Sequence, residues 1–255
     1  MSRLQELNSS LNYLSIIIPC YNEANRTNLT PRLKHLLRFV QNIKQPYEVI
    51  FSLDGCSDNT ESIISEFINS RKLISWSIVS NKINRGKGYA IRQGIQAANG
   101  TYILFMDADL SVQLQYIYRF INQIEPNVCL IGSRYLKESE IRSKRPLKRA
   151  IISRLTRIVT RPLIKTKLTD TQCGFKLFPK AAIESHLQTM RCDKWLFDVE
   201  LLMVLESKKI IIKELPIIWE NDNCSTLDDT AIDDAIDELR LLYKKKRSRK
   251  GKFRC

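Results

Sequence analysis

The chain has 255 residues, of which 44% are hydrophobic and 27% are charged. This length fits one large domain or two small ones, and this composition excludes a wholly disordered or fibrous protein. The 41 lysines and arginines outnumber the 27 acidic residues and give a net charge of +14. Such an excess favours an anionic partner, whether nucleic acid, anionic lipid or phosphorylated substrate.

The sequence lacks the targeting and metal-binding patterns that mark several further classes of protein. No segment reaches the ~18 consecutive apolar residues of a membrane-spanning helix, and the polar residues 1–14 do not form a signal peptide. The seven cysteines contain no C-x-x-C pair and the chain has only two histidines. A disulfide framework, a zinc site and a His-rich metal centre are therefore not expected, and we expect a reducing, cytoplasmic compartment.

Short apolar runs alternate with segments of helical periodicity from residue 14 onward. Strands are predicted over 14–19, 47–53, 74–80, 102–106 and 128–131. Helices are predicted over 29–43, 61–69 and 87–98, with another between the last two strands. This alternation predicts an α/β fold, a mainly parallel sheet with helices on both faces. Ligands of such sheets bind beyond the carboxyl ends of the strands, so the polar residues at those ends are the candidates for a site.

The composition becomes strongly basic after residue 134. Residues 137–167 hold eleven basic residues against two acidic ones. Apolar and basic residues at helical spacing predict an amphipathic helix over 147–161, which Pro162 ends or bends. Two interpretations stay open. The helix either lies on an anionic membrane, or it docks on the core through Leu147, Ile151, Leu155 and Ile158.

The last sixty residues contain two predicted elements and a marked change in the sign of charge. A helix is predicted over 196–205 and an extended segment over 210–219. Residues 228–238 carry six acids, whereas residues 244–254 carry eight bases and no acid. We expect one α/β domain over 1–220 and an acidic-then-basic helix with a flexible tail over 221–255. The basic tail would add loose attraction to an anionic membrane.

Two carboxylates, Asp107 and Asp109, directly follow a buried strand. Carboxylates at positions i and i+2 can face one divalent cation, Mg²⁺ or Mn²⁺, which in turn holds a diphosphate. The alternative is a solvated turn. It is less favoured at this position because two uncompensated acids beside a core are costly.

Other strand ends carry related features. Tyr21 and Glu23 follow the first strand, and Asp54 follows the second, where it can accept hydrogen bonds from a base or ribose. Asp58 can cap the next helix. In the NRGKG segment the glycines allow close backbone approach and Lys87 supplies a point charge for phosphate. Each feature also has a plain interpretation as turn, cap or solvated lysine, but four at successive strand ends rarely coincide by chance.

The sequence resembles family 2 glycosyltransferases of the GT-A fold, and within them the polyprenyl-phosphate sugar synthases. The resemblance covers about residues 14–219. Its motifs are IPCYNE (18–23), DGCSDNT (54–60), NRGKG (84–88), DADL (107–110), GSR (132–134), TDTQCGFKLF (169–178) and WLFDVE (195–200). The TDTQCGFKLF string is similar to the dolichyl-phosphate β-glucosyltransferase branch rather than the mannosyl one.

The resemblance implies an inverting, metal-dependent transfer of a hexose, expected to be glucose from UDP-glucose. Asp107 and Asp109 would hold Mg²⁺ or Mn²⁺, and Asp109 would be catalytic. The residues that would bind the nucleotide-sugar donor are Pro19, Tyr21, Glu23, Asp54, Lys87, Asp107 and Arg134. Two departures from the family pattern are Leu53, where an acid is usual, and Ser111, where mannosyl synthases often have glutamine. The second weakens a third side-chain metal ligand and GDP-mannose as donor.

The acceptor decides whether a catalytic base is required. A lipid monophosphate has a second pKa of about 6, so it is mostly dianionic at neutral pH and needs positive charge more than a base. The candidates for binding a polyprenyl phosphate are Arg145, Lys148, Arg149 and Gln172. A hydroxyl acceptor would need a carboxylate base, for which Asp170 is the best candidate. With a lipid phosphate, Asp170 would orient the nucleophile or balance the arginines, and its plain interpretation is a turn cap.

The leading hypothesis is a glycosyltransferase peripheral to the cytoplasmic face of a membrane. Members of the glucosyl branch often carry an N-terminal membrane helix that this sequence lacks, so peripheral attachment or a soluble variant is expected. The alternatives are a family 2 transferase that acts on a glycan or protein hydroxyl, and a basic nucleic-acid-binding module. No RRM, KH, zinc-finger or helix-turn-helix pattern is visible, so no nucleic acid partner is expected.

Overall fold

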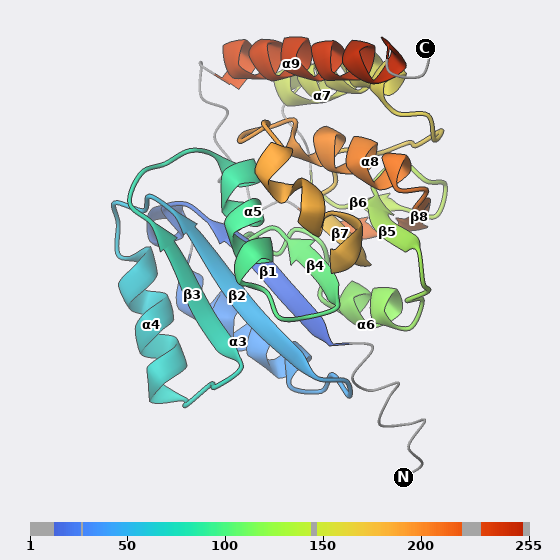
Figure 1. The fold of residues 1–255 in the computed structure, drawn as a ribbon. Helices are drawn as coiled ribbons and strands as arrows, with labels where there is room; N and C mark the ends of the chain where they lie inside the picture. The colour runs from blue at the N-terminus through green and yellow to red at the C-terminus, as the bar shows by residue number, and fades with distance from the viewer. Residues whose placement is uncertain (1–12, 27, 144–146, 221–230, 252–255) are drawn as a thin grey trace.

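The computed structural model describes residues 13–26, 28–143, 147–220 and 231–251 (Figure 1). A seven-stranded sheet in the order β3-β2-β1-β4-β7-β5-β8 forms its centre. The strands are β1 (Leu14–Cys20), β2 (Tyr47–Asp54), β3 (Trp76–Asn81), β4 (Tyr102–Met106), β5 (Val128–Ser133), β7 (Phe175–Pro179) and β8 (Ile211–Pro216). All neighbours are parallel except β7, which is antiparallel to both β4 and β5. The predicted α/β fold with a mainly parallel sheet is confirmed.

Helices cover both faces of the sheet, as Figure 1 shows. One face packs against α3 (Leu29–Val40), α4 (Thr60–Ser70) and α6 (Gln115–Ile121), and the other against α5 (Lys87–Ala97) and α8 (Phe197–Ser207). Successive residues of β1 alternate between the two cores: Ile16 and Ile18 join the first, and Ile17 joins the second. Burial on both faces explains why this strand is a continuous apolar run.

Smaller elements complete the described chain. A short helix, α2 (Glu23–Arg26), follows β1, and a two-stranded parallel sheet pairs β6 (Glu140–Ile141) with β9 (Ile218–Trp219). The single turns of 3-10 helix are η1 (Arg161–Leu163), η2 (Lys180–Ala182) and η3 (Glu184–Thr189). Among the described helices, none is both long and apolar enough to cross a bilayer.

The predicted basic helix is α7 (Leu147–Thr160), which tightens into η1 at Pro162 as expected. Leu155 and Ile158 are 56% and 59% exposed. Docking on the core is therefore wrong for these two residues. The side chains of Leu147 and Ile151 lie outside the described part.

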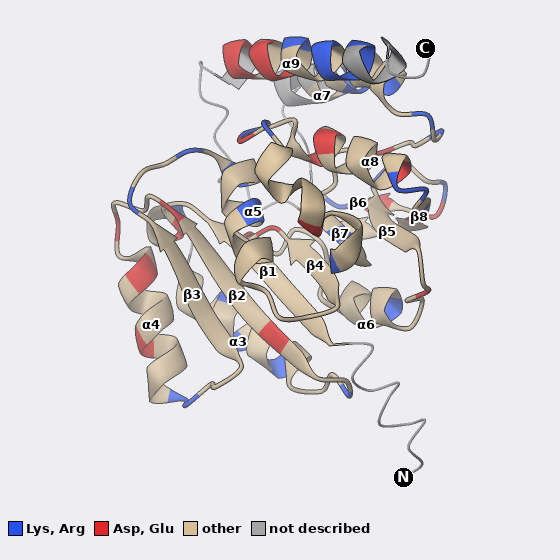
Figure 2. Cartoon of the chain, in the orientation of Figure 1, with Lys and Arg blue, Asp and Glu red and all other residues tan. Residues whose placement is uncertain are grey.

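Helix α9 (Ala231–Gly251) lies beside α7 (Figure 1), and the Tyr243 hydroxyl donates to the Val159 carbonyl at 2.8 Å. Its acidic side chains are at the start and its basic ones follow, as Figure 2 shows. The flexible tail expected from residue 244 is wrong as far as Gly251, because the helix continues to that residue. Residues 252–255 lie outside the described part.

One face of α9 is attached to the loop before α8. The Glu238 carboxylate accepts hydrogen bonds from the backbone N–H groups of Lys194 (2.7 Å) and Leu196 (2.8 Å). Lys245 Nζ lies 2.6 Å from Oε1 of Glu200, which is fully buried on α8. The loop and α8 therefore have polar partners on α9.

Candidate functional site

The chemistry-bearing residues meet at one edge of the sheet. The carboxyl ends of the parallel strands β1, β2, β4 and β5 point to this edge. Because β7 is antiparallel, the segment that precedes it arrives at the same edge (Figure 1). This arrangement brings together the segments at the strand ends, with the NRGKG segment at the start of α5 beside them. These segments are residues 20–23, 54–58, 107–110, 134 and 170–174.

Lys87 is held within a group of acids. Its Nζ lies 2.5 Å from Oδ1 of Asp107, and both side chains are about one third exposed, at 34%. Burial lowers the pKa of Lys87, but the nearby carboxylates of Asp107, Asp198 and Asp109 outweigh it and raise the pKa overall. Burial and the Asp107 charge raise the pKa of Asp109, whose Oδ1 accepts the Ser111 N–H at 2.9 Å. A cation near this pair of acids is therefore favoured.

The Asp107 carboxylate fits in a space that only a glycine leaves open. The Asp107 N–H donates to the Gly174 carbonyl at 3.1 Å. A Cβ atom at position 174 would lie 2.0 Å from Oδ2 of Asp107, well inside van der Waals contact. Gly174 is thus required for the observed position of the carboxylate, a role that its place in the TDTQCGFKLF motif did not indicate.

The buried ammonium group of Lys176 stabilises the residues that precede β7. Lys176 is fully buried, and its Nζ donates to the Cys173 carbonyl at 2.6 Å and to the Asp198 carboxylate. The same Nζ lies 5.2 Å from the centre of the Phe105 ring. Because a buried cation needs a paired anion, Lys176 and Asp198 stabilise one another and fix the residues before β7.

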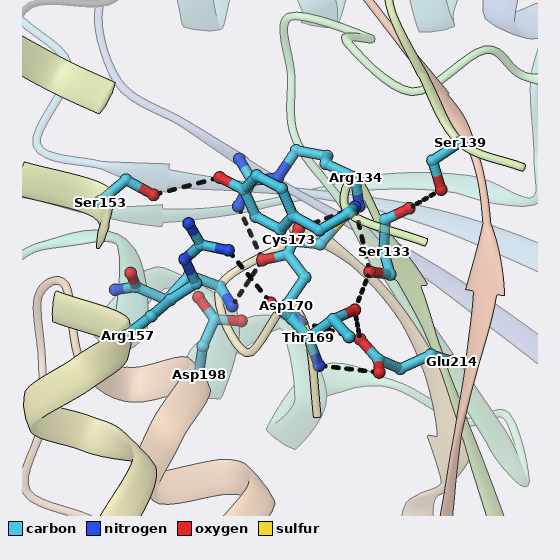
Figure 3. Close-up of polar contacts among 12 residues, drawn as sticks. Ser133, Arg134, Ser139, Ser153, Arg157, Thr169, Asp170, Cys173, Asp198 and Glu214 are labelled. Carbon is cyan, nitrogen blue, oxygen red and sulfur yellow. Dashed lines mark hydrogen bonds and ion pairs between the residues drawn. The ribbon is translucent and has the colours of Figure 1, made fainter. Parts of the chain in front are cut away.

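Asp170 and Arg134 form a bidentate ion pair (Figure 3). Arg134 Nε and Nη2 donate to the two Asp170 oxygens at 2.6 and 2.8 Å, and its backbone N–H donates at 3.1 Å. Burial raises the pKa of Asp170, but the charge and hydrogen bonds of Arg134 outweigh it and hold the pKa below its ordinary value. The carboxylate is therefore a weak base, and the charge of Arg134 already has a partner.

Strand β8 fixes the backbone beside this pair. The Glu214 carboxylate accepts hydrogen bonds from the N–H groups of Thr169 and Asp170, both at 2.8 Å (Figure 3). The Thr169 hydroxyl is shared between Glu214 and Ser133, each at 2.7 Å. Asp170 is thus held by its backbone as well as by its side chain.

Asp54 is occupied by the NRGKG segment. It is 2% exposed, and its carboxylate accepts the N–H groups of Arg85 at 3.0 Å and Gly86 at 2.6 Å. The carboxylate therefore joins the end of β2 to the residues that carry Lys87. Asp58 is not the N-cap of α4, which is Asn59, but its carboxylate accepts the N–H of Thr60, the first residue of the helix, at 3.0 Å.

The aromatic and acidic residues after β1 lie at the same end of the sheet as Asp107 and Asp109. Tyr21 is 38% exposed, whereas Glu23 is 7% exposed. Burial and the charge of Asp109 raise the pKa of Glu23, and Arg26 at 3.7 Å lowers it, which together give a value of about 7. Glu23 is therefore electrostatically connected to the Asp107–Asp109 pair. Pro19, within β1, completes the predicted donor residues on this strand.

The predicted acceptor residues are placed only in part. Arg145 lies outside the described residues, and Lys148 and Arg149 are described only as backbone in the first turn of α7. Gln172 lies at the site: its N–H donates to Asp170 Oδ1 at 3.3 Å, and its side-chain amide donates to the Trp195 carbonyl at 3.5 Å. Whether these residues bind an acceptor stays a prediction.

Two carboxylates of this group are suited to a divalent metal. Asp107 and Asp109 offer hard oxygen ligands, which Mg²⁺ and Mn²⁺ prefer. Within the described residues no three His, Cys, Asp or Glu side chains form a metal-binding cluster. A metal at this pair would therefore take its other ligands from substrate and water, as Mg²⁺ commonly does with phosphates.

Comparisons with known proteins agree with the resemblance seen in the sequence. The sequence model of Glycosyl transferase family 2 matches residues 15–187. A dolichyl-phosphate beta-glucosyltransferase of Dictyostelium discoideum is 32% identical over 247 residues, which cover 91% of this chain and 74% of that protein. The Homo sapiens dolichyl-phosphate beta-glucosyltransferase is 31% identical over 218 residues, 81% of this chain and 67% of that protein.

A solved structure shares the fold. Glucosyl-3-phosphoglycerate synthase from Mycobacterium tuberculosis, crystallised with Mn²⁺, UDP and glucosyl-3-phosphoglycerate, superposes with a TM-score of 0.64. The identity is 13%, and the alignment covers 96% of this chain and 84% of that one. At this identity the likeness concerns the fold, and it confirms the GT-A arrangement expected from the sequence.

The contact between Gly174 and Asp107 predicts a specific non-additivity. We expect Gly174→Ala to lower the free energy of unfolding by about 2–3 kcal/mol, because the new methyl group displaces the Asp107 carboxylate. In an Asp107→Ala background the same change should cost less than about 1 kcal/mol. Urea unfolding of the four proteins measures this cycle. An equal cost in both backgrounds would show that the clash lies elsewhere.

The raised pKa of Glu23 predicts a pH dependence of stability. The folded protein retains a proton on Glu23 up to about pH 7, whereas the group's ordinary value is 4.5. Stability contributed by this proton is lost as the pH rises through that interval. Glu23→Gln should therefore reduce the loss of unfolding free energy between pH 5 and pH 8 by about 2 kcal/mol.

Urea unfolding at each pH, in metal-free buffer, measures the effect. Glu66→Gln removes an exposed carboxyl of α4 and controls for a general change in charge. Identical pH profiles of wild type and Glu23→Gln would contradict the raised pKa.

Proposed function

Because the chain belongs to glycosyl transferase family 2, we propose that it transfers glucose from UDP-glucose to a polyprenyl phosphate at the cytoplasmic face of a membrane. The observation that carries this proposal is the 32% identity with a dolichyl-phosphate beta-glucosyltransferase along 91% of the chain. The geometry of the strand-end site supports each part of the reaction, which we take to be a single displacement that inverts the anomeric carbon.

The donor side is formed by the Asp107–Asp109 pair and Lys87. Both carboxylates fit a divalent cation, and Gly174 leaves the space in which Asp107 is held. When bound, Mg²⁺ or Mn²⁺ would neutralise charge on the departing diphosphate. Lys87 supplies a further positive charge at 2.5 Å from Asp107, and Asp54 holds the residues that position it. Tyr21 and Pro19 would line the nucleotide side of the pocket.

The acceptor side favours a phosphate over a hydroxyl. A phosphate dianion attacks without losing a proton, so no general base is required. A hydroxyl needs a base, and the ion pair with Arg134 lowers the pKa of Asp170 and weakens it in that role. The state of Asp170 therefore supports the lipid-phosphate acceptor and disfavours the alternative of a glycan or protein hydroxyl.

Helix α7 provides a surface suited to an anionic membrane. Leu155, Ile158 and Val159 are 56%, 59% and 40% exposed and lie on one face of the helix. Exposed basic residues accompany them, including Arg154 and Arg161. An apolar face flanked by arginines is typical of a helix that lies in the headgroup region. We propose that α7 places the site at the lipid surface.

The first prediction of this function is donor and acceptor dependence. Purified protein with Mn²⁺ should release UDP from UDP-glucose only when a polyprenyl phosphate is present. UDP-GlcNAc and GDP-mannose should be poor donors. Asp109→Ala should reduce turnover by about a hundredfold or more, because charge on the leaving group is no longer stabilised. Glu125→Ala removes an acid at the opposite end of the strands, and this control variant should keep its turnover.

Two outcomes would redirect the assignment. UDP release that ignores the lipid but requires a glycan or protein acceptor would favour the hydroxyl transferase with Asp170 as base. No release with any donor from folded protein would indicate an inactive member of the family.

The second prediction concerns the membrane surface of α7. The double variant Leu155→Gln/Ile158→Gln should lower partitioning onto phosphatidylserine-containing vesicles by about tenfold or more, because two apolar side chains no longer enter the lipid. Ile74→Gln/Ile211→Gln removes two equally apolar residues, 100% and 58% exposed, at the starts of β3 and β8. Vesicle sedimentation compares the two. Equal losses in both variants would overturn the assignment to α7.

A further inference from the structure

The cations at the site differ in whether they have an anionic partner. Lys87 is paired with Asp107, Arg134 with Asp170 and Lys176 with Asp198. Each of these positive charges is therefore already matched inside the protein. A dianionic acceptor phosphate requires additional charge from another residue.

Arg157 of α7 lies beside the Arg134–Asp170 pair without such a partner (Figure 3). Its guanidinium stacks on the Tyr135 ring, 3.7 Å from the ring centre, and Nη1 donates to the Thr169 carbonyl at 3.3 Å. No carboxylate among the described residues forms an ion pair with it, and its buried Nε has no hydrogen-bond partner. A guanidinium has five N–H donors, and a carbonyl neutralises none of its charge.

A second buried polar atom near this position is also unsatisfied. The hydroxyl of Thr171, which is 6% exposed and follows Asp170 in the chain, has no hydrogen-bond partner. Buried polar groups are normally hydrogen-bonded, and exceptions call for a specific reason. Arg157 contacts the Thr169 carbonyl, two residues before Thr171, and an arginine without a carboxylate partner among the described residues at this position favours an anion with oxygen acceptors.

The orientation of α7 links this cation to the lipid surface. Ser153 and Arg157, one turn apart, face Tyr135, and the Tyr135 and Ser153 hydroxyls are 3.4 Å apart. Leu155 and Ile158 of the same helix are exposed. One helix thus offers an apolar face outward and a guanidinium toward the site. A molecule with a hydrocarbon chain and a phosphate head would place its chain against the apolar face and its phosphate against the guanidinium.

We propose that Arg157 binds the phosphate of the polyprenyl phosphate acceptor, an inference that rests on the proposed function. In the transfer, a phosphate oxygen forms a bond to the anomeric carbon of glucose while the bond from that carbon to the UDP oxygen breaks, and the electron pair leaves with UDP. No proton moves. A guanidinium remains protonated at neutral pH, so it holds the dianion without transferring a proton to the attacking oxygen.

The test separates phosphate binding from a general loss of positive charge. Arg157→Met removes the arginine that faces the site, and Arg38→Met removes an exposed arginine in the last turn of α3, outside both the site and α7. With farnesyl phosphate in detergent as acceptor, Arg157→Met should raise the acceptor KM by about ten- to a hundredfold, as expected for a lost charge-assisted hydrogen bond. The KM for UDP-glucose should change by less than about twofold, and Arg38→Met should leave both constants near wild type.

Arg157→Lys provides a second variant that keeps the charge. It should recover part of the acceptor affinity, and it tests the proposal if Arg157→Met does not fold. An unchanged acceptor KM in Arg157→Met, or equal effects of Arg157→Met and Arg38→Met, would overturn the proposal.

Direct binding of farnesyl phosphate, measured by calorimetry without donor, distinguishes this inference from the proposed function. Loss of binding in Arg157→Met supports the inference even if no transfer is seen with UDP-glucose. Transfer by the wild type with unaltered binding in Arg157→Met would retain the function and remove Arg157 from it.

Discussion

The insertion of one antiparallel strand between two parallel ones is the constraint on which the site depends. In a wholly parallel sheet, a segment that precedes a strand lies at the edge opposite the carboxyl ends. Because β7 runs the other way, pairing Lys176 with Phe105 and Ile131, its preceding residues reach the carboxyl ends of β1, β2, β4 and β5. Asp170 and Gly174 therefore meet Arg134 and Asp107 there. The buried Lys176 secures this arrangement because its ammonium group binds Cys173 and Asp198 at once.

Charge in the interior of the site is closely balanced, although the chain as a whole carries +14. Lys87, Arg134 and Lys176 are each paired with a carboxylate. Other positive charge lies on surfaces such as the later turns of α9, seen in blue in Figure 2. Paired charges position groups within the site, while the surface charge acts on anionic partners over a longer range.

Much of this arrangement could be predicted from sequence, and the exceptions have physical reasons. The parallel strands were recognisable because burial on both faces makes them continuous apolar runs, and Asp107, Asp54 and Lys87 follow from the rule that ligands bind at strand ends. The position of β7, antiparallel between β4 and β5, was not predicted, because Lys176 interrupts the apolar pattern of this strand. The occupation of Asp54 by backbone N–H groups, and the direction in which Arg157 faces, depend on tertiary contacts between segments far apart in the chain. The hydrophobic periodicity of a sequence does not predict such long-range contacts.

The attachment of α9 has a consequence for the order in which the protein is made. Within the part of the chain that the structure describes, the N–H groups of Lys194 and Leu196 both donate to Glu238. During translation, the loop before α8 is synthesised well before its acceptor, so these donors stay with water until α9 has emerged and docked. The same loop accepts the Tyr89 N–H through Asp193, next to the glycines that position Lys87. Completion of the strand-end site is therefore a late event in biogenesis, linked to the synthesis of α9.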